Sequence, residues 1–141
     1  HSLNTDRINQ ISLTDAIDEE LKRMHNLGFQ TELTSSGTVF TLPGDRKILV
    51  YRIAQEALGN ARKHAGAGKI AIDLAYTKEQ LTMTITDDGK GFDSDDANPR
   101  HSTGLLNMQQ NADSLGGDYH LETAAGKGTK ITLTINRNEH S

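Results

Sequence analysis

Two stretches that alternate between apolar and polar residues constrain the fold of this chain more than any other feature. They run from Lys69 to Tyr76 (KIAIDLAY) and from Gln80 to Asp87 (QLTMTITD), and a short turn separates them. A period of two is typical of a β-strand with one buried face. Two such strands joined by a short turn predict a β-hairpin. A second hairpin is predicted from DYHLETA and TKITLTIN (118–124 and 129–136), which Ala-Gly-Lys-Gly joins.

Three further segments have the spacing of helices. The first follows a capping box formed by Ser12 and Asp15. A second is expected to begin at Asp45, as its N-cap, and to end near Ala65, and a third is GLLNMQQNADSL (104–115). Between the first two helices lie two short strand-like pieces, FQTELTS and TVFTL (29–35 and 38–42). This order predicts a two-layer α/β sandwich, with a mixed, largely antiparallel sheet packed on about three helices.

Composition excludes several classes of protein. A chain of 141 residues forms one domain with a proper core. A net charge of −4, with no basic run longer than two residues, argues against a nucleic-acid partner. The chain has no cysteine, and no apolar run approaches the roughly 20 residues that cross a bilayer. We therefore expect a soluble, cytoplasmic domain and, because the chain does not start with methionine, a fragment of a longer protein.

The second predicted helix carries polar residues beside its apolar stripe. At 100° per residue, Asn60 falls about 40° to one side of Glu56, and Lys63 about 20° to the other side. A carboxylate, an amide oxygen and an ammonium so aligned could hold a metal-bound phosphate, because Mg²⁺ takes oxygen ligands and lysine supplies a compact positive charge. The same three residues also fit an ordinary solvated helix edge with a charge pair. Angular position alone does not separate these two interpretations.

An aspartate falls on the apolar side of the second strand of the first hairpin. Asp87 continues the series that begins at Leu81, and Thr129 has the same parity in the last strand. Because a lone buried carboxylate costs several kcal/mol, Asp87 needs a partner. The exocyclic amine of a purine is a donor that Asp87 and Thr129 could recognise together. Alternatively, Asp87 caps the glycine turn that follows it.

Glycines recur at the ends of these predicted elements. Gly104 stands where a helix is expected to begin, and backbone N–H groups at such a position bind phosphate. The sequence contains no GxxxxGK[ST] motif, so a Walker-type phosphate loop is excluded. Taken singly, the glycines also fit ordinary turns. Besides Gly104, the glycines at the ends of predicted elements are Gly89, Gly91, Gly126 and Gly128.

Four motifs in order, QEALGNARKHA, DDGKGF, GLLNM and GKGT, resemble the ATP-binding catalytic domain of bacterial sensor histidine kinases. Among these kinases, the chain is most similar to the group whose response regulators are NarL-like. The wider superfamily includes DNA gyrase, the MutL repair proteins and the heat-shock chaperone ATPases. The resemblance covers roughly residues 12–136, and the motifs together are highly specific.

The resemblance implies a role for each matching position. Asn60 would coordinate Mg²⁺, and Glu56 would occupy the position of the catalytic base. Lys63 and His64 would approach the phosphates and the ribose of ATP. Asp87 would accept from the adenine amine, assisted by Thr129. The remaining nucleotide-binding positions are glycines and one leucine: Gly89, Gly91, Gly104, Leu105, Gly126 and Gly128. Gly104 and Leu105 would start the helix behind the triphosphate, and the loop before them, from Phe92, would be the ATP lid.

The chain also departs from the family pattern. Ser102 stands where the family usually has a glycine, and Asn111 where an arginine often follows, and both departures concern the phosphate contacts of this region. The opening HSLNTDRI resembles the end of a dimerisation and phosphoacceptor region, but the E-L-H-D-type phosphoacceptor motif is absent. His1, His25, His101, His120 and His140 are therefore interpreted as surface residues.

These features together predict a Mg-ATP-binding kinase domain that presents ATP to a histidine on a separate helical hairpin. Residues 1–11 would be the remnant of the phosphoacceptor region, 12–137 the catalytic domain and 138–141 a tail. A NarL-like response regulator would act downstream, and the fragment itself would be monomeric. The alternatives are a gyrase-like ATP hydrolase and a nucleotide-binding module without catalysis.

Overall fold

The computed structural model describes residues 5–65, 68–89, 99–124 and 126–138. Its five-stranded sheet has the order β1-β2-β3-β5-β4, in which β1 and β2 are parallel and all other pairs are antiparallel. The strands are β1 (Gln30–Gly37), β2 (Lys69–Tyr76), β3 (Gln80–Asp87), β4 (Asp118–Thr123) and β5 (Thr129–Asn136). Both predicted hairpins are confirmed, as β2–β3 and β4–β5.

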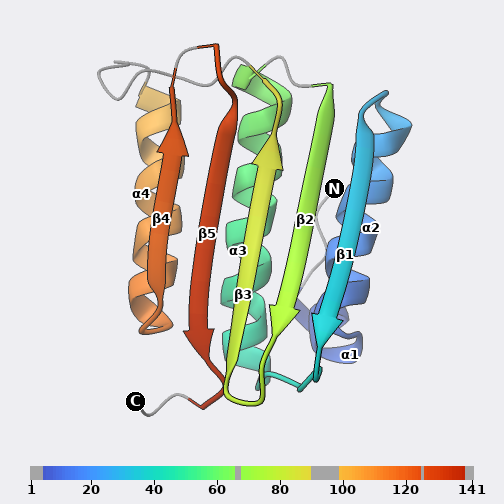
Figure 1. Cartoon of the computed structure of the whole chain (residues 1–141), viewed down its shortest axis with the longest axis vertical. Coiled ribbons are helices and arrows are strands. Elements are labelled where there is room, and N and C mark those ends of the chain that lie inside the picture. The colour runs from blue at the N-terminus through green and yellow to red at the C-terminus, as the bar shows by residue number, and fades with distance from the viewer. Residues whose placement is uncertain (1–4, 66–67, 90–98, 125, 139–141) are drawn as a thin grey trace.

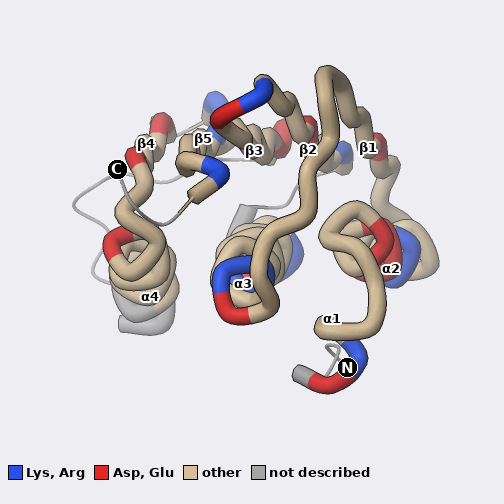
Figure 2. Tube along the Cα trace, turned by 90° about the horizontal axis from the view of Figure 1, so that it is seen from below, with Lys and Arg blue, Asp and Glu red and all other residues tan. Residues whose placement is uncertain are grey.

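The helices form a second layer. They are α1 (Thr5–Gln10), α2 (Leu13–Asn26), α3 (Gly44–Asn60), which continues as a π-helical segment (Ala61–Ala65), and α4 (Pro99–Ser114). Figures 1 and 2 show α2, α3 and α4 side by side on one face of the sheet, and none of the described helices lies on the other face. The predicted two-layer α/β sandwich is thus confirmed. Within the described ranges, no helix combines the length and apolarity that spanning a bilayer requires.

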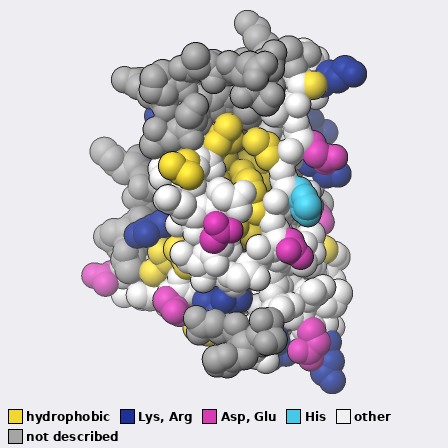
Figure 3. Space-filling model, turned by 90° about the vertical axis from the view of Figure 1, so that its left-hand side faces the viewer, with side chains coloured by type: hydrophobic (Ala, Val, Ile, Leu, Met, Phe, Trp, Pro, Cys, Tyr) yellow, Lys and Arg dark blue, Asp and Glu magenta, His cyan; other side chains and the backbone are white. Residues whose placement is uncertain are grey.

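The core lies between these two layers, where the alternating residues of the strands meet the apolar stripes of the helices. In β2 and β3, Ile72 pairs with Ile85 and Leu74 with Met83, and all four side chains are buried. Helix α2 begins as the capping box predicts, because Ser12 Oγ accepts a hydrogen bond from Asp15 N at 3.0 Å. At the edge of the molecule formed by α4 and β4, some hydrophobic side chains remain visible at the surface (Figure 3).

Two helix starts and one predicted strand differ from the sequence-based expectations. α3 begins at Gly44 after Pro43, so Asp45 lies inside the helix and is not its N-cap. The segment TVFTL (38–42) forms no strand. Its buried Phe40 packs edge-on against Tyr76, with ring centroids 5.1 Å apart, so the alternation reflects core packing rather than strand pairing. α4 begins at Pro99 rather than Gly104, because proline suits the first turn of a helix.

We expect Gly37→Ala to destabilise the fold strongly. Gly37 has φ +85°, and a Cβ atom there would lie only 1.7 Å from the carbonyl oxygen of Tyr76. The left-handed backbone costs an alanine about 1–2 kcal/mol, and overpacking adds about 1–3 kcal/mol. Gly116→Ala is a matched control, because Gly116 has φ +65° but open space around the added methyl group. Urea unfolding should therefore show a larger decrease in the free energy of unfolding for Gly37→Ala than for Gly116→Ala. Equal decreases would contradict the steric argument.

Candidate functional site

The predicted site residues lie on elements that end or begin at one end of the sheet. Figure 1 shows that α3 and β3 end there, and that β5 and α4 begin there. This arrangement follows from the topology, because β3 is antiparallel to β5 and α3 runs in the same direction as β3. Residues that are far apart in the sequence are thereby brought to a common edge.

Gly104 brings the backbone of α4 against the polar edge of α3. A Cβ atom at Gly104 would lie 3.0 Å from Glu56 Oε2 and 3.4 Å from Asn60 Oδ1. A methyl group at this position would contact the ends of these two side chains more tightly than is usual, so Glu56 and Asn60 would have to shift slightly. The expectation that Gly104 starts the helix was wrong, since it lies within α4. In the structure, Gly104 lies at the contact between α3 and α4, next to the side chains of Glu56 and Asn60.

Asn60 is suited to bind a hard cation, although it would be only one of several ligands. Its amide oxygen and the Glu56 carboxylate both lie near Gly104, and oxygen donors of this kind suit Mg²⁺. Among the residues that the structure describes, no cluster of three or more acidic or histidine side chains could hold a metal alone. Mg²⁺ usually keeps several waters and binds through one or two protein oxygens together with substrate phosphates.

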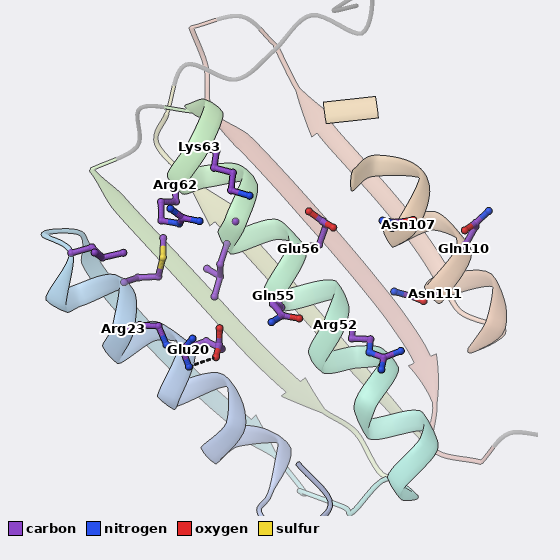
Figure 4. Close-up of a pocket in the computed structure, with 14 residues that line it drawn as sticks. Glu20, Arg23, Arg52, Gln55, Glu56, Arg62, Lys63, Asn107, Gln110 and Asn111 are labelled. Carbon is purple, nitrogen blue, oxygen red and sulfur yellow. Dashed lines mark ion pairs between the residues drawn. The ribbon is translucent and has the colours of Figure 1, made fainter. Parts of the chain in front are cut away.

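Glu56 and Lys63 line a cavity of about 770 Å³ on the outward side of α3. Figure 4 shows this cavity between α2 and α4, with α3 and its π-helical extension in the middle. Asn107, Gln110 and Asn111 contribute the α4 side. Asn111, where the family often has an arginine, therefore faces the same cavity as Glu56. The cavity does not include Asp87.

Asp87 ends β3 and lies opposite Thr129 in the register of β3 and β5. Its Oδ1 accepts a hydrogen bond from Gly89 N at 2.9 Å, so Asp87 does cap its own turn. The carboxylate is nevertheless partly buried, and this desolvation raises the pKa of Asp87, with the nearby charge of Asp88 adding to the rise. Capping the turn and recognising a ligand are therefore compatible roles for this residue.

Asp88 is a residue that the sequence analysis missed. Its Oδ1 accepts hydrogen bonds from the backbone N–H groups of Gly68 and Lys69, both at 2.8 Å. These bonds lower the pKa of Asp88 and join the start of β2 to the end of β3. Asp88 therefore positions the turn that carries Asp87. The second aspartate of DDGKGF could have indicated this role. Neighbouring residues of a strand face opposite sides, so Asp88 was expected to point away from Asp87.

The glycines of the β4–β5 hairpin have two different surroundings. Gly128 has φ +77°, and a Cβ atom there would lie 2.3 Å from the carbonyl oxygen of Asp87, so it allows close contact with the end of β3. Gly126 has φ +80° and open space, as in an ordinary turn. The hydroxyl of Thr129 lies 3.1 Å from that of Thr123. A second depression of about 420 Å³ includes Asp87, Gly128 and Thr129.

The structure thus brings the predicted residues together in two groups. Glu56, Asn60 and Gly104 form one group, with Lys63 in the same cavity as Glu56. Asp87, Gly89, Gly128 and Thr129 form the other. Leu105 is partly buried and packs on the core. Gly91 and most of the proposed lid lie outside the described residues, as does the side chain of His64.

Comparisons with known proteins show which proteins this chain is similar to. Residues 44–139 match the family model of histidine kinase-, DNA gyrase B- and HSP90-like ATPases. The sensor histidine kinase MctS of Rhizobium johnstonii is 33% identical over 96% of this chain. The signal transduction histidine-protein kinase/phosphatase DegS of Bacillus subtilis is 35% identical over 63% of it. This chain spans 30% and 24% of the length of these two relatives.

Solved structures share the fold. The histidine kinase domain of the blue-light activated kinase of Erythrobacter litoralis superposes with a TM-score of 0.69 at 20% identity, over 92% of this chain and 63% of that one. The Acinetobacter baumannii histidine kinase AdeS gives a TM-score of 0.65 at 16% identity, over 89% and 64%. The matched family model includes every predicted site residue, and the chain therefore belongs to the family of histidine kinase-, DNA gyrase B- and HSP90-like ATPases, with sensor histidine kinases among its relatives.

Proposed function

We propose that this domain binds Mg-ATP at the common end of α3, β3 and α4 and presents the γ-phosphoryl group to a histidine on a separate helical hairpin. The observation that carries the proposal is the contact of Gly104 with Glu56 and Asn60. This contact places a carboxylate and an amide oxygen at the end of the sheet where Asp87 also lies. The relatives named sensor histidine kinases support transfer to histidine as the reaction.

Each residue has a physical reason for its proposed role. Asp87 accepts from the adenine amine, and its partly buried position strengthens a hydrogen bond to an ionised acceptor. Asn60 donates an oxygen to Mg²⁺, which would neutralise phosphate charge. Lys63, exposed at the end of the helix, attracts the phosphates. Glu56 takes the proton of the attacking imidazole, and the rest of the catalysis is positioning and charge stabilisation.

The proposal also includes the downstream partner, the location and the bounds of the domain. A NarL-like response regulator would receive the phosphoryl group, and the domain would act in the cytoplasm as a monomer. We propose residues 12–137 as the ATP-binding unit, with 1–11 as part of the phosphoacceptor region and 138–141 as a tail. Helix α1 nevertheless packs on the core, since Ile8 is only 2% exposed and Arg7 forms an ion pair with Glu19 at 2.9 Å.

The sharpest test of the metal site is Asn60→Ala. Loss of a ligand to Mg²⁺ should weaken ATP binding about 10- to 100-fold when Mg²⁺ is present, as for a lost bond to a charged group. In EDTA, the variant and the wild type should bind ATP equally. Isothermal titration calorimetry measures both conditions. Asn107→Ala is the matched control, because Asn107 lines the cavity from α4 without a proposed ligand role. An equal loss with and without Mg²⁺ would contradict the assignment of Asn60 as a metal ligand.

A further inference from the structure

One edge of the sheet combines an open strand with a groove beside it. Among the described strands, β1 pairs with β2 alone, and its eight residues keep one continuous register without a bulge. Figure 1 shows β1 at the edge of the sheet, with α2 covering one side of it. A groove of about 510 Å³ lies between them, lined by residues of α2 and by Thr31 and Leu33 of β1. We call it the α2–β1 groove.

The backbone of three β1 residues points away from the sheet. Gln30 N donates a hydrogen bond to the carbonyl oxygen of Gly68 at 2.8 Å, at the start of the parallel pairing with β2. Successive residues of a strand direct their N–H and C=O groups to opposite sides, so Thr31, Leu33 and Ser35 direct theirs outward. Thr31 and Leu33 also line the α2–β1 groove. A strand added at this edge would therefore hydrogen-bond to residues that form the groove.

The β1 edge lacks the features that usually prevent further strand pairing. Proteins protect exposed edges with proline, lysine, bulges or very short strands. The sequence of β1, QTELTSSG, contains neither proline nor lysine, and Glu32 is its only charged residue. The strand at the opposite edge, β4, is shorter, with six residues, and carries Asp118 and Glu122. Of the two edges, β1 is therefore better suited to accept another strand.

The α2–β1 groove is suited to an aliphatic side chain. Its apolar residues are Leu21, which is only 2% exposed, and the partly buried Leu33. Lys22 Nζ pairs with Asp18 Oδ2 at 3.1 Å, so these two charges of the α2 wall balance each other. A charged side chain entering the groove would lose water without gaining a free opposite charge from this pair. An aliphatic side chain would instead gain contact with the two leucines.

Glu32 indicates the charge of a segment that would pair with β1. Because Thr31 and Leu33 face α2, Glu32 lies on the other face of the sheet, where it is exposed and forms no ion pair with a described residue. An opposite charge directly across two paired strands is stabilising. A second copy of β1 has no basic residue and could not supply it. The segment is therefore expected to place a lysine or arginine opposite Glu32.

We propose that β1 is a docking edge for an extended segment of a separate partner protein. The segment adds a strand to the sheet, places aliphatic side chains in the α2–β1 groove and pairs a basic side chain with Glu32. Backbone hydrogen bonds provide the affinity of such an added strand, and the groove and Glu32 provide its selectivity. The α2–β1 groove shares no residue with the cavity of Glu56 or the depression of Asp87, so docking requires no nucleotide.

Fluorescence anisotropy with a labelled peptide tests this edge in the absence of nucleotide. The probe has the length of β1 and alternates valine with threonine, with one threonine near the centre replaced by lysine. Two further versions carry N-methyl groups on one or the other alternating set of residues. Only one set directs its N–H groups toward β1, so one version should bind about tenfold or more weakly and the other like the parent peptide. Equal affinities of the two versions, or no binding of the parent peptide, would overturn the proposal.

Variants of the domain test the same edge from the other side. Ser35→Pro removes an outward N–H group and leaves the bonds to β2 in place, so it should weaken peptide binding about 5- to 10-fold. Ser35→Ala keeps that N–H group and should bind like the wild type. Equal affinities of these two variants would contradict strand addition. Sedimentation of the peptide-free domain addresses the other occupant, because a dimer that Ser35→Pro dissociates would assign the edge to a second copy and overturn the proposal.

A charge exchange tests the contact with Glu32 independently of backbone changes. Glu32→Lys should weaken binding of the lysine peptide about fivefold, and a peptide with glutamate in place of the lysine should restore it. Asp118→Lys is the matched control, because it makes the same change of charge on the exposed β4 edge and should leave both affinities unchanged. Equal effects of Glu32→Lys and Asp118→Lys would show attraction by net charge alone and would overturn the assignment of Glu32.

Discussion

Replacement of Glu56 by glutamine is expected to slow phosphoryl transfer to a supplied phosphoacceptor hairpin by about 10²- to 10⁴-fold, the usual contribution of a general base. Glutamine keeps the shape of the side chain but cannot accept the proton of the attacking imidazole. The packing next to Gly104, where Glu56 Oε2 lies 3.0 Å from the position of a Cβ atom, should be preserved. ATP affinity should therefore stay near that of the wild type.

Rapid-quench measurements with γ-labelled ATP would report the transfer rate, and calorimetry the affinity. Glu20→Gln is a matched control, because Glu20 is the other acidic residue that lines the same cavity, and its loss should not slow transfer. A transfer rate for Glu56→Gln within threefold of the wild type would rule out Glu56 as the base. If the wild type released phosphate to water and never labelled the hairpin, the domain would be a hydrolase of the gyrase kind.

Replacement of Asp87 by asparagine is expected to change affinity and stability in opposite directions. The asparagine side chain presents an N–H donor toward the adenine amine, and a mismatched buried group costs about 1–3 kcal/mol. ATP affinity should fall about 5- to 150-fold, with or without Mg²⁺. The nucleotide-free domain should become more stable, because the substitution removes a partly buried charge while the amide oxygen can still accept from Gly89 N.

The stability difference should depend on pH in a defined direction. Burial raises the pKa of Asp87 above its ordinary value of 3.8, so the folded state binds the proton more tightly than the unfolded state. The wild type is therefore most stable, relative to the variant, below pH 3.8, and this advantage is lost as pH rises through the raised pKa. The gain from Asp87→Asn should be fully present at neutral pH and should vanish in acid.

Asp88→Asn provides the opposite case. Two backbone N–H groups lower the pKa of Asp88, so its ionised form stabilises the fold above pH 3.8, and this contribution is lost as pH falls through the lowered pKa. Its replacement should therefore destabilise the domain at neutral pH. Thermal unfolding from acid to neutral pH, together with ATP titrations, measures both variants. Wild-type ATP affinity in Asp87→Asn would show that Asp87 only caps its turn.

Local patterns in the sequence were sufficient to predict much of this fold. The alternation in 69–76 and 80–87 predicted a hairpin because one buried face imposes a period of two on a strand. The Ser12 cap was also predictable, since its bond to Asp15 N spans three residues. The order of the four motifs indicated the ATPase family and hence the candidate residues, because their types and spacing were visible in the chain itself.

Features that depend on contacts between distant segments were not predictable in the same way. The alternation around Phe40 imitates a strand, but its burial comes from packing on Tyr76. Arginine is usually a surface residue, yet Arg46 is only 3% exposed. It donates hydrogen bonds to the carbonyl oxygens of Leu115 and Asn136, at the ends of α4 and β5. Such partners exist only once the chain is folded.

The sequence by itself determined which residues could carry the chemistry, because residue type and spacing along one helix or strand are local properties. Tertiary structure alone decided what surrounds them. It placed Gly104 against Glu56 and Asn60. It also brought Asp88 within hydrogen-bond distance of the backbone at the start of β2, which positions the turn after Asp87. Each of these contacts joins residues from different elements, and only the packing of α3, α4 and the strands sets the distances between them.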